Sequence, residues 1–254
     1  MRRIVVKVGS AVLTQDGEIA QERMSGLVDF LFELRQKNEV ILVSSGAVAA
    51  GYTKLKLDRS VLKNKQALAA IGQPVLMDKY AKKFAQYDVI TSQVLVTAAN
   101  LRKGDDVKRI KNTVDTLLEN GVIPIVNEND ATSTEELEVG DNDQLSAYMT
   151  KHTASDMLII LSDIDAYYDS DPRANPNAKV LKVVNEINKE ELLKEVTPNS
   201  VFATGGIVTK LKAAAYLLDC GIEMFLASGF DLSDVKSFTL RNEHNGGTIF
   251  KKAL

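Results

Sequence analysis

Short apolar runs alternate with amphipathic segments along the whole chain. Each run is rich in Val and Ile and has the length of a β-strand. The runs are residues 4–8, 40–43, 88–96, 122–126, 157–161, 223–227 and 248–250. Between them, apolar residues recur at helical spacing, which predicts helices over residues 24–37, 107–120 and 209–221.

Nearly continuous apolar strands separated by helices are typical of a parallel sheet that is covered on both faces. We therefore expect an α/β fold with a central, mainly parallel sheet, and one domain over residues 1–254. The segment 167–179 is the most turn-rich part of the chain and contains Pro172 and Pro176. We expect it to be a long loop within that domain.

Composition excludes several classes of protein. The chain has 254 residues and a formal net charge of −3, which gives no basic surface for nucleic acid. The one cysteine, Cys220, cannot form a disulfide framework or a zinc site built on cysteines. The apolar stretch after Met1 is too short for a signal peptide, and no segment approaches the ~20 apolar residues of a membrane span. We expect a cytoplasmic protein that binds neither membrane nor nucleic acid.

Glycines, hydroxyls and acids follow several of the predicted strands. In open α/β sheets, ligands bind beyond the carboxyl ends of the strands. The segments at these ends are residues 7–10, 44–47, 127–130 and 162–163. Their convergence predicts a binding site along one edge of the sheet.

Lys7 lies inside an apolar run, and two interpretations of it are open. It could belong to an edge strand, with its ammonium group extending to water. Alternatively, it could hold an anion next to Gly9, where the missing Cβ lets a phosphate approach the backbone.

The segment ATGGIVTKLKAA, residues 203–214, combines paired glycines with a lysine and a helical pattern. Backbone N–H groups at the start of a helix attract phosphate. The segment is not a Walker A loop, because three residues separate Gly206 from Lys210. A lysine near a helix N-terminus is unfavourable unless an anion offsets it, so we favour phosphate binding over a solvated turn.

Two acidic clusters require more than helix capping. Capping uses one side chain, yet Asp141, Asn142 and Asp143 stand in a row, and Asp130 lies upstream. The surplus should bind a group that donates hydrogen bonds, such as an ammonium group, a lysine or a metal ion. Residues 131–140 between the clusters have the polar composition of a mobile loop over a site.

Two hydroxyls and a glycine complete the candidate site. Ser44, Ser45 and Gly46 could donate hydrogen bonds to a carboxylate or phosphate, whereas the alanines after them fit tight helix packing. His152 and His244 have no companion residues of the kind found in hydrolases, and we expect both to be structural or surface residues.

Together these motifs resemble the amino acid kinase family, and within it the glutamate 5-kinases. The motifs are residues 5–10, 44–52, 69–73, 127–131, 139–147, 161–178, 203–214 and 247–250. The resemblance implies a three-layer αβα sandwich around a mainly parallel sheet. It also implies phosphorylation of the side-chain carboxylate of L-glutamate by ATP, the first step of proline synthesis.

The resemblance also assigns residues to two subsites. The ATP-binding positions are Lys7, Ser162, Asp163, Thr204, Gly205, Gly206, Ile207, Val208, Thr209 and Lys210, to which we add Gly9 as a phosphate contact. The glutamate-binding positions are Ser45, Asp130 and Asn142, to which we add Gly46.

We expect three residues to be catalytic. Lys7 and Lys210 would flank the transferred phosphoryl group, and the Asp143 carboxylate would pair with both lysines. Asp130, helped by Asn142, would hold the α-ammonium group of glutamate. Mg²⁺ would be bound mainly through the ATP phosphates, so no protein metal site is expected.

Other readings stay open. The nearest is another activity of the same family, such as N-acetylglutamate or aspartate kinase, and a more distant one is a non-catalytic sensor of nucleotides or amino acids. Many glutamate 5-kinases have a C-terminal PUA domain, but this sequence stops at Leu254, so we expect a kinase domain alone. Family members are usually dimers or tetramers, so we expect a homo-oligomer. Feedback inhibition by proline is usual in the family, which makes proline a candidate inhibitor here, and the sequence leaves open whether it inhibits this short form.

Overall fold

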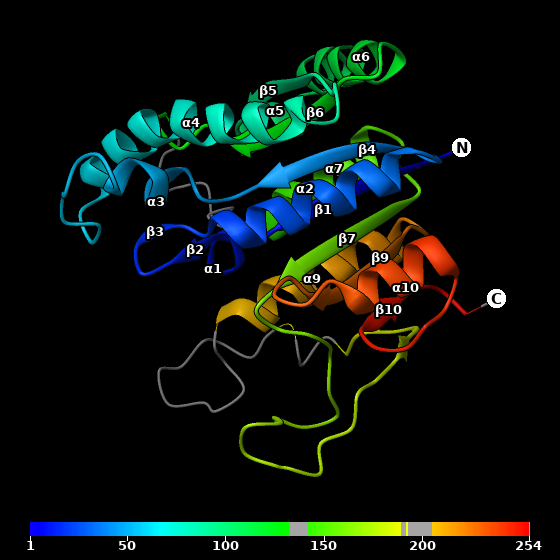
Figure 1. Ribbon diagram of the computed structural model, residues 1–254. Helices are drawn as coiled ribbons and strands as arrows, with labels where there is room; N and C mark the ends of the chain where they lie inside the picture. The colour runs from blue at the N-terminus through cyan, green and yellow to red at the C-terminus, as the bar shows by residue number, and fades with distance from the viewer. Residues whose placement is uncertain (133–141, 189–191, 193–204, 254) are drawn as a thin grey trace.

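A computed structural model of the chain describes residues 1–132, 142–188, 192 and 205–253. Its centre is an eight-stranded sheet with the order β5-β6-β4-β1-β7-β9-β10-β8 (Figure 1). The strands are β1 (Arg2–Val8), β4 (Asn38–Ser44), β5 (Thr91–Val96), β6 (Ile123–Glu128), β7 (Met157–Ser162), β8 (Val183–Val184), β9 (Glu223–Ser228) and β10 (Thr248–Phe250). The pairs from β5 to β9 are parallel, and β10 runs antiparallel to β9.

Helices cover both faces of this sheet. In Figure 1, α2 (Gln21–Arg35) and α10 (Ser233–Arg241) lie in front, and α7 (Asn142–His152) and α9 (Gly205–Asp219) lie behind. The front layer also contains α4 (Leu62–Ala85), and α5 (Ala98–Arg102) and α6 (Gly104–Glu119) belong to the back layer. This is the three-layer αβα sandwich expected from the sequence.

Strand β1 shows how the two layers are separated. Its residues alternate in direction, so Ile4, Val6 and Val8 join the core beneath α2, whereas Val5 joins the core beneath α7 and α9. By the same alternation, Lys7 points toward α7 and α9. In register, Lys7 lies between Val43 of β4 and Ile160 of β7, at the carboxyl ends of three central strands.

Short elements follow the first two long strands. Helix α1 (Ser10–Leu13) follows β1, and a small hairpin joins β2 (Thr14–Gln15) to β3 (Glu18–Ile19). Its turn residues Asp16 and Gly17 both have positive φ, as a type I′ hairpin turn requires. Helix α3 (Ala47–Tyr52) follows β4.

Each strand and helix predicted from the apolar pattern is present. The pattern did not predict several elements, among them α4, α5, α10, the β2–β3 hairpin and the short strand β8, and it gave no sign that β10 is antiparallel. Residues 167–179 form turns, as expected, closed by a bridge between Tyr168 and Val180. Within the described residues, no helix combines the length and apolar character needed to cross a membrane.

Candidate active site

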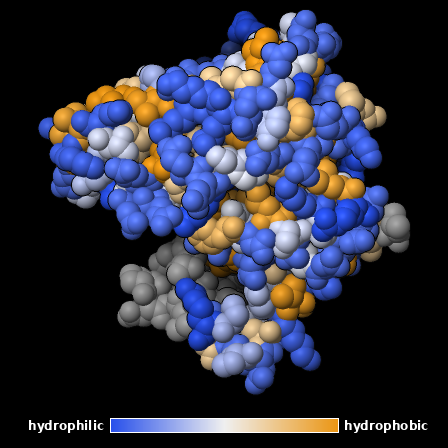
Figure 2. All heavy atoms as spheres, in the orientation of Figure 1, coloured by the Kyte–Doolittle hydropathy of each residue, from blue (hydrophilic) through white to orange (hydrophobic). Residues whose placement is uncertain are grey.

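A cavity of about 510 Å³ opens at the carboxyl ends of the central strands. Figure 2 shows the surface hollowed at its left side, where β4 and β7 end in Figure 1. The strand-end residues predicted from the sequence converge on it. Those that line it are Lys7, Gly9, Ser45, Gly46, Asp130, Asn142, Ser162, Asp163 and Lys210.

Three buried charges form the floor of this cavity. The Lys7 Nζ lies 2.5 Å from Oδ1 of Asp143, and the Lys210 Nζ lies 3.0 Å from its Oδ2. Each lysine side chain is 5% exposed, and Asp143 is fully buried. Lys7 belongs to a central strand, so the edge-strand interpretation of this residue is wrong. The two lysines and the carboxylate together carry a formal charge of +1, which favours an anion in the cavity.

The charge state of Asp143 follows from these contacts. Burial alone would raise the pKa of Asp143, but the charges and hydrogen bonds of Lys7 and Lys210 outweigh it, and the net pKa is lowered. The carboxylate is therefore ionised at neutral pH and holds both ammonium groups in place. The Thr209 hydroxyl lies 3.0 Å from the same carboxylate.

Two glycines leave open space beside these lysines. A Cβ at Gly9 would lie 3.8 Å from the Lys7 Nζ, and one at Gly206 would lie 4.0 Å from the Lys210 Nζ. Gly206 is in the first turn of α9, where backbone N–H groups favour anions. The Gly9 N–H already donates to the Leu161 carbonyl at 3.1 Å, so Gly9 leaves room for a phosphate chain but does not offer it the N–H contact expected from the sequence. A phosphate chain could contact both ammonium groups and the backbone at the start of α9.

A second group of polar side chains lies on the α3 side of the cavity. Nδ2 of Asn142 donates to the Ser45 hydroxyl and to Oδ1 of Asn127, each at 2.9 Å. Gly46 has φ of 109°, a conformation that favours glycine, and it begins α3. That turn brings Ser45 and Gly46 to the cavity.

Asp130 has a different environment from Asp143. Burial raises its pKa, and no described residue donates a hydrogen bond to its carboxylate. A partly buried carboxylate of this kind would gain from a ligand that brings a positive charge.

A neighbouring cavity of about 360 Å³ shares Asp163 with the first. It is lined by Ile164, Tyr167, Tyr168 and Ile207 among others, which suits a flat aromatic ring. Ser162 and Asp163 shape the passage between the cavities, since the Ser162 hydroxyl donates to Asp163 at 2.8 Å.

Some predicted positions lie elsewhere. Val208 is a buried core residue and lines neither cavity, because it faces the interior side of α9. Thr204, Asp141 and residues 133–140 lie outside the described residues. His244 contacts Phe225 and Phe238, and His152 contacts Tyr148, so both have the structural surroundings expected.

Several lining residues had no role in the interpretation of the sequence, among them Asn127, Glu128 and Arg59. Asn127 and Glu128 end β6 inside the cavity, and Arg59 lies at its edge, where its guanidinium stacks on Tyr52. The position of Asn127 and Glu128 after an apolar run was the available signal. Arg59 lies in a loop, and its sequence neighbours give no indication of the site.

Known proteins with similar sequences belong to one family of kinases. A model of the amino acid kinase family matches residues 2–228. The chain is 51% identical to the glutamate 5-kinase of Wolinella succinogenes over 98% of both chains. It is 49% identical to that of Leishmania donovani, over 98% of this chain and 95% of the relative.

Solved structures share the fold at low identity. The carbamate kinase from Giardia lamblia bound to AMP-PNP is 15% identical, with a TM-score of 0.68 over 99% of both chains. The UMP kinase from Ureaplasma parvum is 18% identical, with a TM-score of 0.64 over 99% of both chains. Given the family match, the close relatives and this shared fold, the chain belongs to the amino acid kinase family.

Proposed function

We propose that this chain is a glutamate 5-kinase. It transfers the γ-phosphoryl group of ATP to the side-chain carboxylate of L-glutamate and yields ADP and L-glutamyl 5-phosphate, for proline synthesis. The observation that carries the proposal is the pair of buried lysines joined through Asp143 at the cavity floor. The close relatives named glutamate 5-kinase indicate that the acceptor is L-glutamate.

The reaction needs charge neutralisation more than acid–base chemistry. A carboxylate oxygen of glutamate forms a bond to the γ-phosphorus, and the bond from that phosphorus to the oxygen of ADP breaks. No proton has to move, so no general base is required. Lys7 and Lys210 stabilise the negative charge that spreads over the transferred group, and Asp143 keeps the two ammonium groups converged.

ATP extends from the first cavity into the second. Its phosphates lie beside Gly9 and Gly206, where the glycines leave room next to the lysines. Its base occupies the neighbouring cavity near Ile207, and Asp163 lies at the passage between the two. Mg²⁺ travels with the ATP phosphates and supplies further charge neutralisation when bound.

Glutamate enters from the α3 side. Its α-ammonium group pairs with the partly buried carboxylate of Asp130, assisted by Asn142. Ser45 and Gly46 supply hydrogen bonds to its carboxylates. N-acetylglutamate has no ammonium charge for Asp130, which argues against that acceptor.

The test is trapping of the acyl phosphate with hydroxylamine in the presence of ATP and Mg²⁺. L-Glutamate, N-acetylglutamate and L-aspartate are supplied separately, and UMP is tested by release of ADP. We expect hydroxamate or pyrrolidone carboxylate with L-glutamate alone. If another acceptor were phosphorylated instead, L-glutamate would not be the substrate. ATP binding without phosphorylation of any acceptor would favour a non-catalytic sensor.

Because the chain belongs to this family, we also propose how it is inhibited, how it assembles and where it acts. L-Proline should inhibit the reaction, whereas D-proline should not, and initial rates measure the difference. The chain should form a homo-oligomer, which light scattering after size exclusion measures. Residues 1–254 should act as one kinase domain in the cytoplasm, where ATP is available.

A further inference from the structure

Gln73 belongs to the motif AAIGQ, residues 69–73, which the ATP and glutamate subsites leave unexplained. It lies in α4, is 7% exposed, and does not line the main cavity. It nevertheless contacts a side chain that does. It also lines a smaller adjoining cavity of about 160 Å³, together with Glu128 and Asp130. Its contact with Asn127 is the route by which it can act on the main cavity.

A chain of amide groups connects Gln73 to the site. Nδ2 of Asn127 donates to Oε1 of Gln73 at 3.0 Å, and Nε2 of Gln73 donates to Oε1 of Gln93 at 3.2 Å. On the other side, Nδ2 of Asn142 donates to Oδ1 of Asn127 at 2.9 Å. The chain runs from the edge strand β5 through α4 and β6 to α7.

The direction of these hydrogen bonds is determined by the backbone. The N–H of Glu128 donates to Oδ1 of Asn127 at 2.9 Å, and a backbone N–H can only donate. Oδ1 of Asn127 is thereby fixed toward Glu128, and its Nδ2 is fixed toward Gln73. Gln73 must then present its oxygen to Asn127.

The same direction determines what Asn142 can offer a ligand. Both of its N–H groups are used, one by Asn127 and one by the Ser45 hydroxyl. No described residue donates to its Oδ1, and Asn142 lines the cavity. Asn142 therefore presents a carbonyl oxygen, which recognises a donor such as an ammonium group and disfavours an acceptor.

We infer that Gln73 is a positioning residue for the amino group of the acceptor, an inference that rests on the proposed function. Oε1 of Gln73 accepts a hydrogen bond from Nδ2 of Asn127. Asn127 is only 3% exposed, so this donor has little access to water. Without that acceptor, Asn127 turns to find another partner, and Asn142 loses the group that orients it.

The backbone next to Gln73 is held closely. A Cβ at Gly72 would lie 1.8 Å from the carbonyl oxygen of Ala47, so α4 packs directly against α3. Glycine at this position lets α4 approach the site closely. This accounts for the pair Gly72–Gln73 in the motif.

The experiment compares Gln73→Met, Gln73→Glu and Gln93→Leu with the wild-type enzyme. Methionine keeps the length of the side chain but removes the acceptor. Glutamate keeps an acceptor for Asn127. Gln93→Leu also removes one hydrogen bond from the chain, but at its exposed end, and serves as the matched control.

The readouts are KM for L-glutamate, KM for ATP, kcat, and the inhibition constant of glutarate, a diacid without an amino group. In Gln73→Met we expect KM for L-glutamate to rise about ten-fold, the effect of one unsatisfied buried donor. KM for ATP and the glutarate constant should stay within about two-fold, since neither depends on the ammonium contact. Gln73→Glu and Gln93→Leu should stay near wild type.

Three results would overturn the inference. If Gln73→Met weakened the binding of L-glutamate and glutarate equally, the role of Gln73 would be structural only. If KM for L-glutamate stayed unchanged, Gln73 would have no role in binding the acceptor. If Gln73→Met does not fold, Gln73→Glu decides. This variant keeps an acceptor for Asn127, so a ten-fold loss of L-glutamate affinity in the folded variant would also overturn the inference. Absence of L-glutamate turnover in the wild-type enzyme is a separate outcome: it refutes the proposed function, and the role of Gln73 with it.

Discussion

Lys210 and Asp130 illustrate two kinds of charge in one cavity. Lys210 is held by Asp143 on the floor, where we propose that the phosphoryl group is transferred. Asp130 lies on the acceptor side and has no described partner. The first should matter most in the transition state, and the second should matter already when glutamate binds.

Lys210→Ala should therefore lower kcat far more than it raises KM for glutamate. Loss of one preorganised charged donor costs about 3 kcal/mol in the barrier, or roughly 100-fold in kcat. Asp130→Ala should show the reverse pattern, with KM for glutamate raised most. Lys212→Ala, an exposed lysine on the same helix, is the control and should change neither constant. Exchanged phenotypes would contradict this division of roles.

Asp130→Asn should make the ligand-free protein more stable at neutral pH while weakening glutamate binding. Burial raises the pKa of Asp130, so the unfolded chain ionises before the folded one. The cost to stability is absent below the unfolded pKa of about 3.9 and is complete above the folded pKa. The gain, about 1 kcal/mol by analogy with other unsatisfied buried groups, should appear at pH 7 and vanish near pH 3. Urea unfolding at both pH values measures it, and an equal gain at both would contradict the explanation.

The contact between α3 and α4 shapes the side of the cavity where we propose that glutamate binds. Gly51 of α3 and Gly72 of α4 face the other helix so closely that neither has room for a Cβ. The resulting packing places Ala47, at the start of α3, beside the residue that precedes Gln73. Glutamate binding should thus depend on two glycines that do not line the cavity.

Gly72→Ala tests that dependence. The added Cβ would overlap the Ala47 carbonyl, so we expect a loss of at least about 3 kcal/mol in stability, together with a raised KM for glutamate. Gly26→Ala in α2 is the matched control, because nothing lies within 4 Å of its added Cβ. That substitution should stabilise the protein by about 0.5–1 kcal/mol through helix propensity. Thermal unfolding and KM distinguish the two, and similar effects of both substitutions would refute the packing argument.

The same helix shows where sequence reasoning ended. The strands were predictable because β-branched runs bury both faces of a parallel sheet, and the lysines were predictable because they adjoin glycines at strand and helix ends. Helix α4 was not predicted, since it packs partly through Ala69 and Gly72 and contains Pro74, which together obscure an apolar stripe. The bond between Gln73 and Asn127 joins residues that are 54 positions apart, and no local pattern contains that information.

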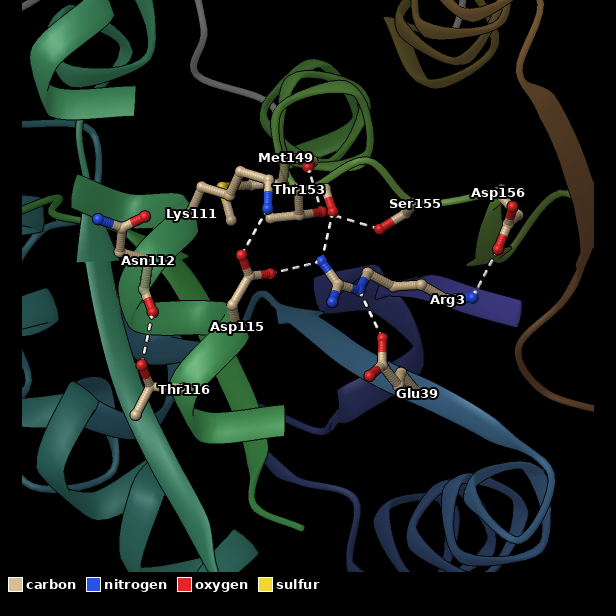
Figure 3. Close-up of polar contacts among 10 residues, drawn as sticks. All are labelled: Arg3, Glu39, Lys111, Asn112, Asp115, Thr116, Met149, Thr153, Ser155 and Asp156. Atoms are coloured by element: carbon tan, nitrogen blue, oxygen red, sulfur yellow. Dashed lines mark hydrogen bonds and ion pairs between the residues drawn. The ribbon is translucent and has the colours of Figure 1, made fainter. Parts of the chain in front are cut away.

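At the scale of the whole molecule, a charged cluster ties the sheet to the back layer of helices at the end of the sheet opposite the cavity. Figure 3 shows Arg3 of β1 donating to Glu39 of β4 and to Asp115 of α6, each at 2.7 Å. The same guanidinium donates to the Thr153 carbonyl at 2.5 Å, and the Lys111 ammonium also reaches Asp115. One side chain thus joins two strands, α6 and the end of α7.

Arg3→Met should lower stability without changing the kinetics. Loss of hydrogen bonds to charged, partly buried groups costs about 2 kcal/mol, or roughly 5 °C in Tm for a chain of this size. Burial alone would raise the pKa of Asp115, but the bonds from Lys111 and Arg3 lower it overall. The contribution is therefore complete above the unfolded pKa of about 3.9 and is lost as pH falls through the folded value, so the difference in Tm should shrink in acid.

The outcome also bears on the proposal of a single domain. If residues 1–254 unfold as one unit, Arg3→Met should move one cooperative transition as a whole, although Arg3 lies at the other end of β1 from Lys7. KM for both substrates should stay unchanged, because the cavity lies at the opposite ends of the strands. A transition that splits in two, with only one part shifted, would show that the layers unfold separately and that this cluster stabilises only one of them.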